Sequence, residues 1–421
     1  MFNLKHFFGR PPETAPPGQL AASYLVSCDR RRFKADAFLD QLLADALHWN
    51  ATDIHVIPES EHVSVRLRID GALRNFLLLQ PLQGRFLVGR LKVVGELDVL
   101  NTFSPQDGAG RLEIAGEVVA FRVSIMPVRA YSGSQERAIL RLFRRRNFDL
   151  KGLGMDNATL QQWKSLLTEP QGMLVLTGPA NSGKTTTIYS SLLEIQHRSR
   201  GERNIATIED PVEFAVPGLS QSQVNPGDGF GFTEALRAMM RQDPQVIMIG
   251  EIRDGETAKI AVEAGLTGHL VLTTVHSKQV TGVFPRLLSL GVGAVRAASA
   301  ILAVLNQRLL RLNCPFCAQP YLPAEEMLGS LPRKINENAQ FMRGAGCDFC
   351  RGTGFYGRGI VNELLVVNAE MRSAVCTGAL SQDLYARAID SGMRTIWQSA
   401  MEAVLSGRAP LEQAIETIGP E

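Results

Sequence analysis

The chain has 421 residues, 45% of them apolar, which is enough to bury a sizeable core and to form two or three domains. Its 44 basic and 42 acidic residues give a formal net charge of +2, which argues against a whole-chain attraction to nucleic acid or anionic lipid. Every apolar stretch of membrane-spanning length is interrupted by charged or strongly polar residues. We therefore expect a soluble chain whose partner is protein, with no membrane insertion.

The first part of the chain predicts a tail and then a small α+β domain. Residues 1–35 are rich in proline and arginine and show no regular spacing, which predicts a tail or docking arm. Helical spacing and strand-like alternation then follow up to residue 143, which predicts an α+β domain over residues 36–143. The expected helices cover residues 37–47 and 86–94, and the expected strands cover residues 63–69, 118–125 and 138–143. The first strand ends in Asp70 and Gly71, a pair typical of a hairpin turn.

The second part of the chain predicts an α/β domain. Residues 144–155 begin with a basic run and continue with two glycines, which predicts a linker. From residue 156 to residue 421, short apolar segments alternate with segments at helical spacing. Such alternation predicts a largely parallel sheet with helices on both faces. The expected strands cover residues 173–177, 205–208, 246–249 and 270–275.

A glycine-rich turn follows the first of these strands. Residues 178–185 read Gly-Pro-Ala-Asn-Ser-Gly-Lys-Thr, and a helical stretch follows. In a P-loop, backbone N–H groups cradle phosphate, the lysine reaches the β- and γ-phosphates, and the last hydroxyl serves Mg²⁺. The plainer alternative, a glycine turn beside an accidental lysine, fits poorly with a strand before it and a helix after it. The residues expected to bind ATP and Mg²⁺ are Gly178, Asn181, Ser182, Gly183, Lys184, Thr185 and Thr186.

Two other strands are expected to deliver carboxylates to the same edge of the sheet. Glu251 follows the strand 246–249, and open α/β sheets bind ligands at the carboxyl ends of their strands. We assign Glu251 to orienting or deprotonating the attacking water. Glu209 is assigned to Mg²⁺ or to water. Capping of the following turn is the alternative for each carboxylate, and it suits Asp210 better than Glu251.

Four of the six cysteines form two Cys-x-x-Cys pairs. Four thiolates at this spacing predict a closed, tetrahedral, structural Zn²⁺ site within a subdomain over residues 312–356. Redox pairing of the thiols is the alternative, and nothing nearby has a thioredoxin pattern. The expected zinc ligands are Cys314, Cys317, Cys347 and Cys350, whereas Cys28 and Cys376 are assigned no function.

These landmarks together resemble the secretion ATPase superfamily, and within it the assembly ATPases of type II secretion and type IV pili. Beside the P-loop, residues 205–213 look like the aspartate box of that family and residues 250–254 look like its Walker B region. Residues 266–276 look like its histidine box. The tetracysteine pattern favours assembly over pilus retraction. The resemblance runs from about residue 37 to the C-terminus.

The resemblance implies a RecA-like P-loop NTPase core and roles that the residues alone leave open. His269 and His276 would each be read as structural on their own, but the resemblance implies that both lie near the γ-phosphate. It also implies that Arg66 or Arg68 reaches the nucleotide as the domains close, with a surface salt bridge as the alternative. A homo-hexamer is implied, which is cytoplasmic and held at the inner membrane by a platform protein.

The leading hypothesis is therefore an ATP-hydrolysing motor that moves two domains against each other to assemble a pilus or a pseudopilus. A nucleic-acid translocase is a second hypothesis, and the absence of a dense basic stripe opposes it. A weakly active, non-enzymatic assembly subunit is a third hypothesis. It is motivated by Ala180 and Asn181, which stand where the family usually has threonine and glycine. Asn181 is expected to be tolerated because asparagine adopts left-handed backbone geometry more readily than most residues.

Overall fold

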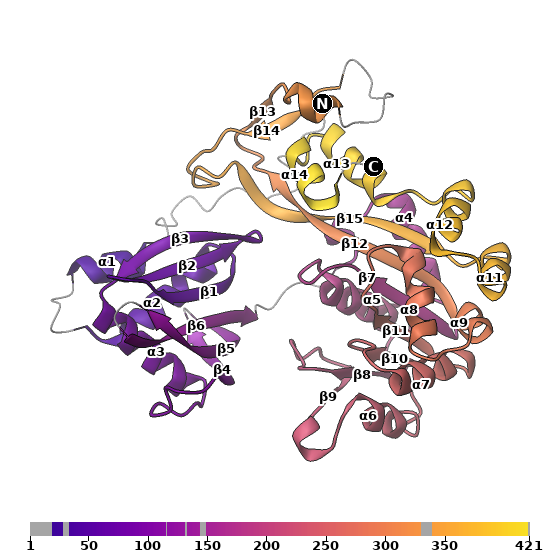
Figure 1. The fold of residues 1–421 in the computed structure, drawn as a ribbon, viewed down its shortest axis with the longest axis horizontal. Helices are drawn as coiled ribbons and strands as arrows, with labels where there is room; N and C mark the ends of the chain where they lie inside the picture. Colours follow the sequence, from indigo (N-terminus) through magenta and orange to yellow (C-terminus); the bar gives the residue numbers. More distant parts are fainter. Residues whose placement is uncertain are drawn as a thin grey trace. The chain divides into compact units, whose positions relative to one another are not determined.

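The computed structural model describes residues 19–27, 33–114, 116–130, 133–143, 149–329 and 339–419. Most of the predicted tail, Cys28 and the first residues of the predicted linker lie outside these ranges. The chain separates into two compact units, Met1–Arg146 and Asn147–Glu421, and each is described by itself (Figure 1). Within the described ranges, no helix combines the length and the apolar character needed to cross a membrane.

The first unit is a six-stranded antiparallel sheet with helices packed on it (Figure 1). The strands lie in the order β3-β2-β1-β6-β5-β4, and helices α2 (Ala35–His48) and α3 (Pro81–Val94) bury their apolar sides in the same core. The strands are β1 (Ala51–Pro58), β2 (Val63–Ile69), β3 (Ala72–Leu79), β4 (Gln106–Ile114), β5 (Glu117–Ala130) and β6 (Gly133–Phe143). The predicted hairpin is confirmed, since β2 pairs with β3 around Asp70 (φ 48°) and Gly71 (φ 85°). Two consecutive positive φ angles match a turn whose twist suits a two-residue hairpin.

A short helix, α1 (Leu20–Ser27), lies within the segment for which the sequence predicts a tail. The carboxylate of Asp45 on α2 accepts hydrogen bonds from the backbone N–H groups of Leu20 (3.0 Å) and Ala21 (2.8 Å). These are N–H groups of the first helical turn, which have no partner within a helix. Eight residues are too few to show a period, so the helix depends on this distant carboxylate and could not be read from its own sequence.

The second unit contains a seven-stranded sheet in the order β15-β12-β7-β11-β10-β8-β9 (Figure 1). All neighbours are parallel except β15, which runs antiparallel to β12 at one edge. The prediction of a largely parallel sheet is therefore confirmed. The strands are β7 (Gly172–Thr177), β8 (Ile205–Glu209), β9 (Ser220–Gln223), β10 (Val246–Ile249), β11 (Leu270–Thr274), β12 (Ile301–Asn313) and β15 (Phe355–Val366).

Helices cover both faces of this sheet, as the alternating pattern predicts. Buried residues of α4 (Asn157–Leu166) and α5 (Lys184–Arg198) form one apolar core with the sheet. A second core lies on the other face. Its helices are α6 (Phe232–Met239), α7 (Gly255–Leu266), α8 (Val283–Ser289), α9 (Ala294–Ala300), α11 (Ala369–Cys376) and α12 (Ser381–Asp390).

The long strands β12 and β15 extend beyond the sheet toward a smaller region (Figure 1). There β13 (Ala318–Pro320) pairs with β14 (Met342–Gly344), and α10 (Glu325–Gly329) follows β13. Helices α13 (Ile396–Leu405) and α14 (Leu411–Ile418) form a further core with β12 and β15. Neither β12 nor β15 is among the strands predicted from the sequence.

Candidate functional site

The glycine-rich turn between β7 and α5 has the backbone geometry of a tight phosphate-binding loop. Gly178 (φ 139°), Asn181 (φ 62°) and Gly183 (φ 87°) all have positive φ. A Cβ atom at Gly178 would lie 2.5 Å from the carbonyl oxygen of Gln307, so only glycine fits there. The expectation that Asn181 adopts a left-handed conformation is confirmed.

Lys184 begins α5 and folds back over the start of the loop. Its ammonium donates hydrogen bonds to the carbonyl oxygens of Gly178 (3.0 Å) and Pro179 (2.8 Å). Burial lowers the pKa of Lys184, the nearby Arg308 guanidinium lowers it further, and the Glu251 carboxylate raises it. The amine of Lys184 therefore lies at the loop, close to a second positive charge, the guanidinium of Arg308.

A buried hydroxyl in the loop is a second observation that fits a bound phosphate group. The hydroxyl of Ser182 is buried, and its Oγ has no hydrogen-bond partner among the described residues. A buried hydroxyl without a partner is costly, and a phosphate oxygen would satisfy it. Thr185 and Thr186 are half-buried in the first turn of α5, where the helix N-terminus favours an anion. The predicted nucleotide residues are thus brought together at one end of α5.

Gln307 on β12 holds this loop in place, although it belongs to none of the predicted motifs. Its side chain is fully buried, donates to the carbonyl oxygen of Ser182 (2.7 Å) and accepts from the hydroxyl of Thr187 (3.0 Å). One amide thus connects β12, the loop and α5. The contact spans 125 residues along the chain, so no local pattern signals it.

We expect Gln307→Leu to destabilise the second unit by about 1–3 kcal/mol, because a buried carbonyl and a buried hydroxyl lose their partner. Chemical denaturation would measure this change, and the KM for ATP should rise because the loop is less well held. Gln319→Leu, at an exposed position on β13, is the matched control. Unchanged stability and unchanged KM in the Gln307 variant would contradict the role of this amide.

Glu251 lies just beyond the carboxyl end of β10, as predicted, and a guanidinium and an imidazole flank it. Its carboxylate is hydrogen-bonded to the guanidinium of Arg253, and its other oxygen lies 3.6 Å from Nε2 of His276. Arg253 also lies 3.7 Å from the carboxylate of Asp210. The hydrogen bond to Glu251 raises the pKa of Arg253. The structure therefore brings Glu251 and His276 to the same edge of the sheet and adds Arg253, to which the sequence analysis assigned no role.

The side chain of Glu209 is almost fully enclosed, and its assigned role toward Mg²⁺ or water stays a prediction. Its side chain is 3% exposed. One oxygen accepts from Thr207 (2.6 Å) and Gln221 (3.0 Å), and the other accepts from the phenol of Tyr189 on α5. Burial and the Glu209 carboxylate raise the pKa of Tyr189 far above its usual value. The described contacts make Glu209 a bridge between α5 and the β8 edge.

The structure does not bring His269 to the phosphate loop of its own chain. β11 runs parallel to β7, with Leu270 opposite Gly172 and Thr274 opposite Leu176. The phosphate loop follows the carboxyl end of β7, whereas His269 precedes the amino end of β11. Five strand residues separate the two edges by about 16 Å. Nδ1 of His269 instead lies 3.1 Å from the carbonyl oxygen of Ala264. The expectation that His269 sits near the γ-phosphate is corrected for this reason.

Arg66 and Arg68, of which one or the other is expected to reach the nucleotide, lie on β2 in the first unit. Both have acidic partners there. Nη2 of Arg66 lies 2.9 Å from the carboxylate of Glu59. Nε of Arg68 lies 3.5 Å from Asp53, which also binds Arg141 (2.9 Å). Their role at the nucleotide stays a prediction.

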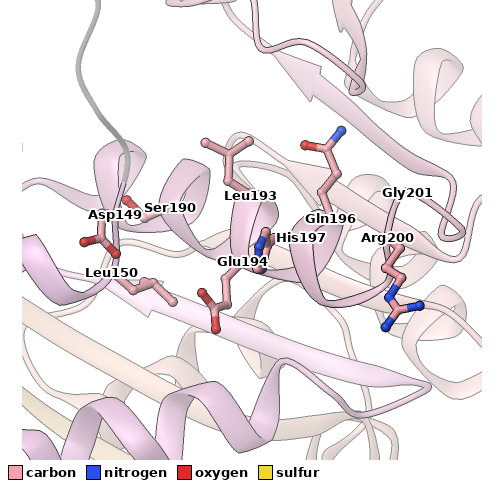
Figure 2. A pocket seen from close by; sticks show the side chains of 9 residues that line it. All are labelled: Asp149, Leu150, Ser190, Leu193, Glu194, Gln196, His197, Arg200 and Gly201. Atoms are coloured by element: carbon pink, nitrogen blue, oxygen red, sulfur yellow. The ribbon is translucent and has the colours of Figure 1, made fainter.

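A shallow pocket of about 730 Å³ lies along the second half of α5, away from the predicted site residues (Figure 2). Of its two acidic lining residues, Glu194 is already bound by Lys164 (3.2 Å) and Arg198 (2.8 Å). The lining residues are Asp149, Leu150, Ser190, Leu193, Glu194, Gln196, His197, Arg200 and Gly201. This pocket shares no residue with the phosphate loop.

The four predicted zinc ligands converge on one point. Their sulfur atoms all lie within 4.8 Å of one another, and three of the pairs are 3.7–3.8 Å apart. Four sulfurs at about 2.3 Å from a tetrahedral Zn²⁺ would be about 3.8 Å apart, so the set fits this ion. Backbone N–H groups of Cys347 and Gly354 donate to Sγ of Cys350, each at 3.2 Å. Such donors stabilise thiolates, the form that binds metal.

The zinc cluster is tied to the C-terminal helices. Asn313 precedes Cys314, and its amide donates to the carbonyl oxygens of Met342 and Gly407, each at 2.9 Å. Its backbone N–H donates to the carbonyl of Arg408 (2.7 Å). Loss of the cluster would therefore disturb the turn between α13 and α14 as well as the β13–β14 pair.

The parallel sheet, the phosphate loop after β7 and the carboxylate after β10, at the same edge of the sheet, define a P-loop nucleotide-binding protein. A family model described as "Type II/IV secretion system protein" matches residues 32–416. The chain therefore belongs to this family.

Two relatives and one solved structure describe the similarity further. The chain is 38% identical to type II secretion system protein E of Dickeya dadantii, over 91% of this chain and 75% of that protein. It is also 38% identical to the type IV pilus assembly ATPase PilB of Thermus thermophilus, over 90% of this chain and 42% of that protein. The structure of the ATPase DotB of Legionella pneumophila matches with a TM-score of 0.70 and 19% identity, over 92% of this chain and 96% of that one. These findings confirm the predicted family and the α/β fold class with its RecA-like core.

Proposed function

We propose that this chain is the ATP-hydrolysing motor that powers assembly of a type IV pilus or a type II secretion pseudopilus. The observation that carries the proposal is the phosphate loop, in which Lys184 and the Ser182 hydroxyl, which has no partner in the described ranges, lie at the sheet edge that also holds Glu251. Membership of the type II/IV secretion system family supports the proposal, as do relatives named as a secretion protein E and a pilus assembly ATPase.

Each residue of the site has a separate role in ATP binding or hydrolysis. Lys184, the loop N–H groups and Ser182 bind the phosphates, and the hydroxyl of Thr185 is a ligand for Mg²⁺. Bound Mg²⁺ supplies positive charge that neutralises the phosphate oxygens. Glu251 orients the attacking water and accepts its proton at a carboxylate oxygen. His276 and Arg253 position that carboxylate, and Glu209 holds β8 against α5.

Hydrolysis is coupled to movement of the first unit relative to the second. Arg66 or Arg68 supplies the positive charge that responds to the nucleotide, exchanging its acidic partner for a phosphate oxygen. The motor works as a homo-hexamer on the cytoplasmic side of the inner membrane, where a platform protein holds it. Zn²⁺ bound by the four cysteines stabilises the region around β13 and β14.

Phosphate release by the purified chain with Mg²⁺ and ATP tests the enzymatic part of this proposal. We expect hydrolysis by the wild type and none by Lys184→Ala, because the ammonium that contacts the phosphates is lost. Lys259→Ala, an exposed lysine on α7, is the matched control and should hydrolyse ATP at the wild-type rate. Failure of the wild type to hydrolyse ATP, even with membranes that carry the platform, would refute the motor function.

The partner is tested by capture from membranes. Tagged Glu251→Gln, held with ATP, should retain an integral membrane protein of the secretion or pilus system, whereas Lys184→Ala should retain less of it. Equal recovery with both variants would contradict a nucleotide-dependent attachment.

A further inference from the structure

Arg308 on β12 lies directly beside the phosphate loop. If Gly178 carried a Cβ, that atom would be 3.3 Å from Nη1 of Arg308. On its other side the guanidinium donates from Nη2 to the carbonyl of Lys278 (3.3 Å), two residues after His276. Arg308 therefore lies between the first residue of the loop and the segment that follows β11.

A network of polar side chains fixes the orientation of this guanidinium. Nη1 donates to Oδ1 of Asn306 (2.7 Å) and to the carbonyl of Gln307 (3.1 Å). Asn306 in turn donates to the carboxylate of Glu363 (2.8 Å), which is 1% exposed. Glu363 also accepts from the phenol of Tyr385 (3.0 Å). An arginine held in this way loses little conformational freedom when it binds a ligand.

Lys184 and Arg308 bring two positive charges close to each other at the loop. Lys184 and Arg308 repel each other, as the lowered pKa of Lys184 reflects after the larger effect of burial. Glu251 is the nearby carboxylate that favours the charged lysine, and Arg253 is already hydrogen-bonded to it. Burial lowers the pKa of Arg308 as well, and the Glu363 carboxylate raises it. An anion of several charges would relieve this repulsion.

We propose that Arg308 is a further phosphate-binding residue, which contacts the nucleotide at the end reached by Lys184 and so favours ATP over ADP. The proposal rests on the proposed ATPase function and adds a residue to it. Bonds to described residues use three of the five N–H groups of the guanidinium, which leaves two for phosphate oxygens. The amine of Lys184 is bonded to the carbonyl of Gly178, the residue beside Arg308. Because a P-loop lysine reaches the β- and γ-phosphates, Arg308 lies at that end of the nucleotide.

Equilibrium binding of ATP and ADP to the full chain tests this role. Arg308→Gln should weaken ATP binding by about 10- to 100-fold, the effect of losing a hydrogen bond to a charged group, and should weaken ADP binding by a smaller factor. Arg308→Lys keeps the charge and should recover part of the ATP affinity. Arg311→Gln removes a guanidinium from the same strand at a position bonded to Gln413, and should bind both nucleotides like the wild type.

The outcomes separate a phosphate contact from a purely structural role. If Arg308→Gln weakens ATP and ADP equally and Arg308→Lys restores nothing, the arginine only supports the loop and the proposal is overturned. Wild-type affinity for both nucleotides in Arg308→Gln would overturn it as well. Either result leaves the ATPase function intact as long as the wild-type chain hydrolyses ATP. Absence of hydrolysis by the wild type is instead the failure of the proposed function.

Discussion

Replacing Glu251 by glutamine should lower kcat for ATP hydrolysis by about 10²- to 10⁴-fold, the range attributed to a positioned general base. Glutamine has nearly the same shape and can still accept the hydrogen bond from Arg253, but it cannot take a proton from water. Binding should persist, because the phosphate loop and Lys184 are untouched. Removing the Glu251 carboxylate also leaves the positive charge of Lys184 less neutralised, which favours binding of the ATP phosphates. Phosphate release and equilibrium binding of ATP would measure the two effects separately.

The matched control for this variant is Glu256→Gln. Glu256 lies in the first turn of α7, is exposed, and pairs with Arg237 rather than with the phosphate site. We expect that control to hydrolyse ATP at close to the wild-type rate. Equal turnover by Glu251→Gln and the wild type would show that another group activates the water.

The second large effect concerns the metal. We expect about one Zn²⁺ per chain, and its removal should unfold the region around β13, β14 and the two last helices. Structural zinc binds zinc-finger peptides with apparent free energies of about 10–16 kcal/mol, as large as the whole stability of about 5–15 kcal/mol of a typical domain. The bonds from Asn313 to the α13–α14 turn extend the effect beyond the cysteines. Hydrogen exchange with and without a chelator would locate the change.

Two cysteine variants separate metal binding from general thiol chemistry. Cys350→Ser removes one of four converging sulfurs and should lower the zinc content and the stability of this region. Cys376→Ser changes an exposed cysteine and should leave both unchanged. Freshly purified, reduced wild-type protein that contains no zinc would exclude the metal site.

Features that depend on neighbouring residues could be read from the sequence. The phosphate loop is one continuous segment after a buried strand, so its spacing is enough to identify it. The zinc ligands form two compact pairs, and the spacing within each pair indicates the metal. The position of Glu251 also follows locally, because a short apolar run ends just before it. In each case the backbone brings the groups together with little help from distant elements.

Features that depend on tertiary packing could not be read in this way. Gln307 and Arg308 reach the loop because β12 lies beside β7, more than 120 residues away along the chain. The apolar run of β12 does not alternate strictly, so its period does not distinguish a buried strand from a helix. His269 shows the converse. It is close to His276 in sequence, but strand β11 lies between the two histidines and places them at opposite edges of the sheet.

One strand, β12, carries residues of both the phosphate region and the zinc region. Six residue steps, about 20 Å of extended chain, separate Arg308 from Cys314. The pairing of β12 with β15 already shifts register between Arg311 and Asn313. One further residue inserted in this interval would turn the metal loop to the other side relative to the nucleotide loop, because side chains of a strand otherwise alternate between its faces. Chimaeras that exchange the cysteine module between relatives therefore need junctions that change the length of this interval by an even number of residues.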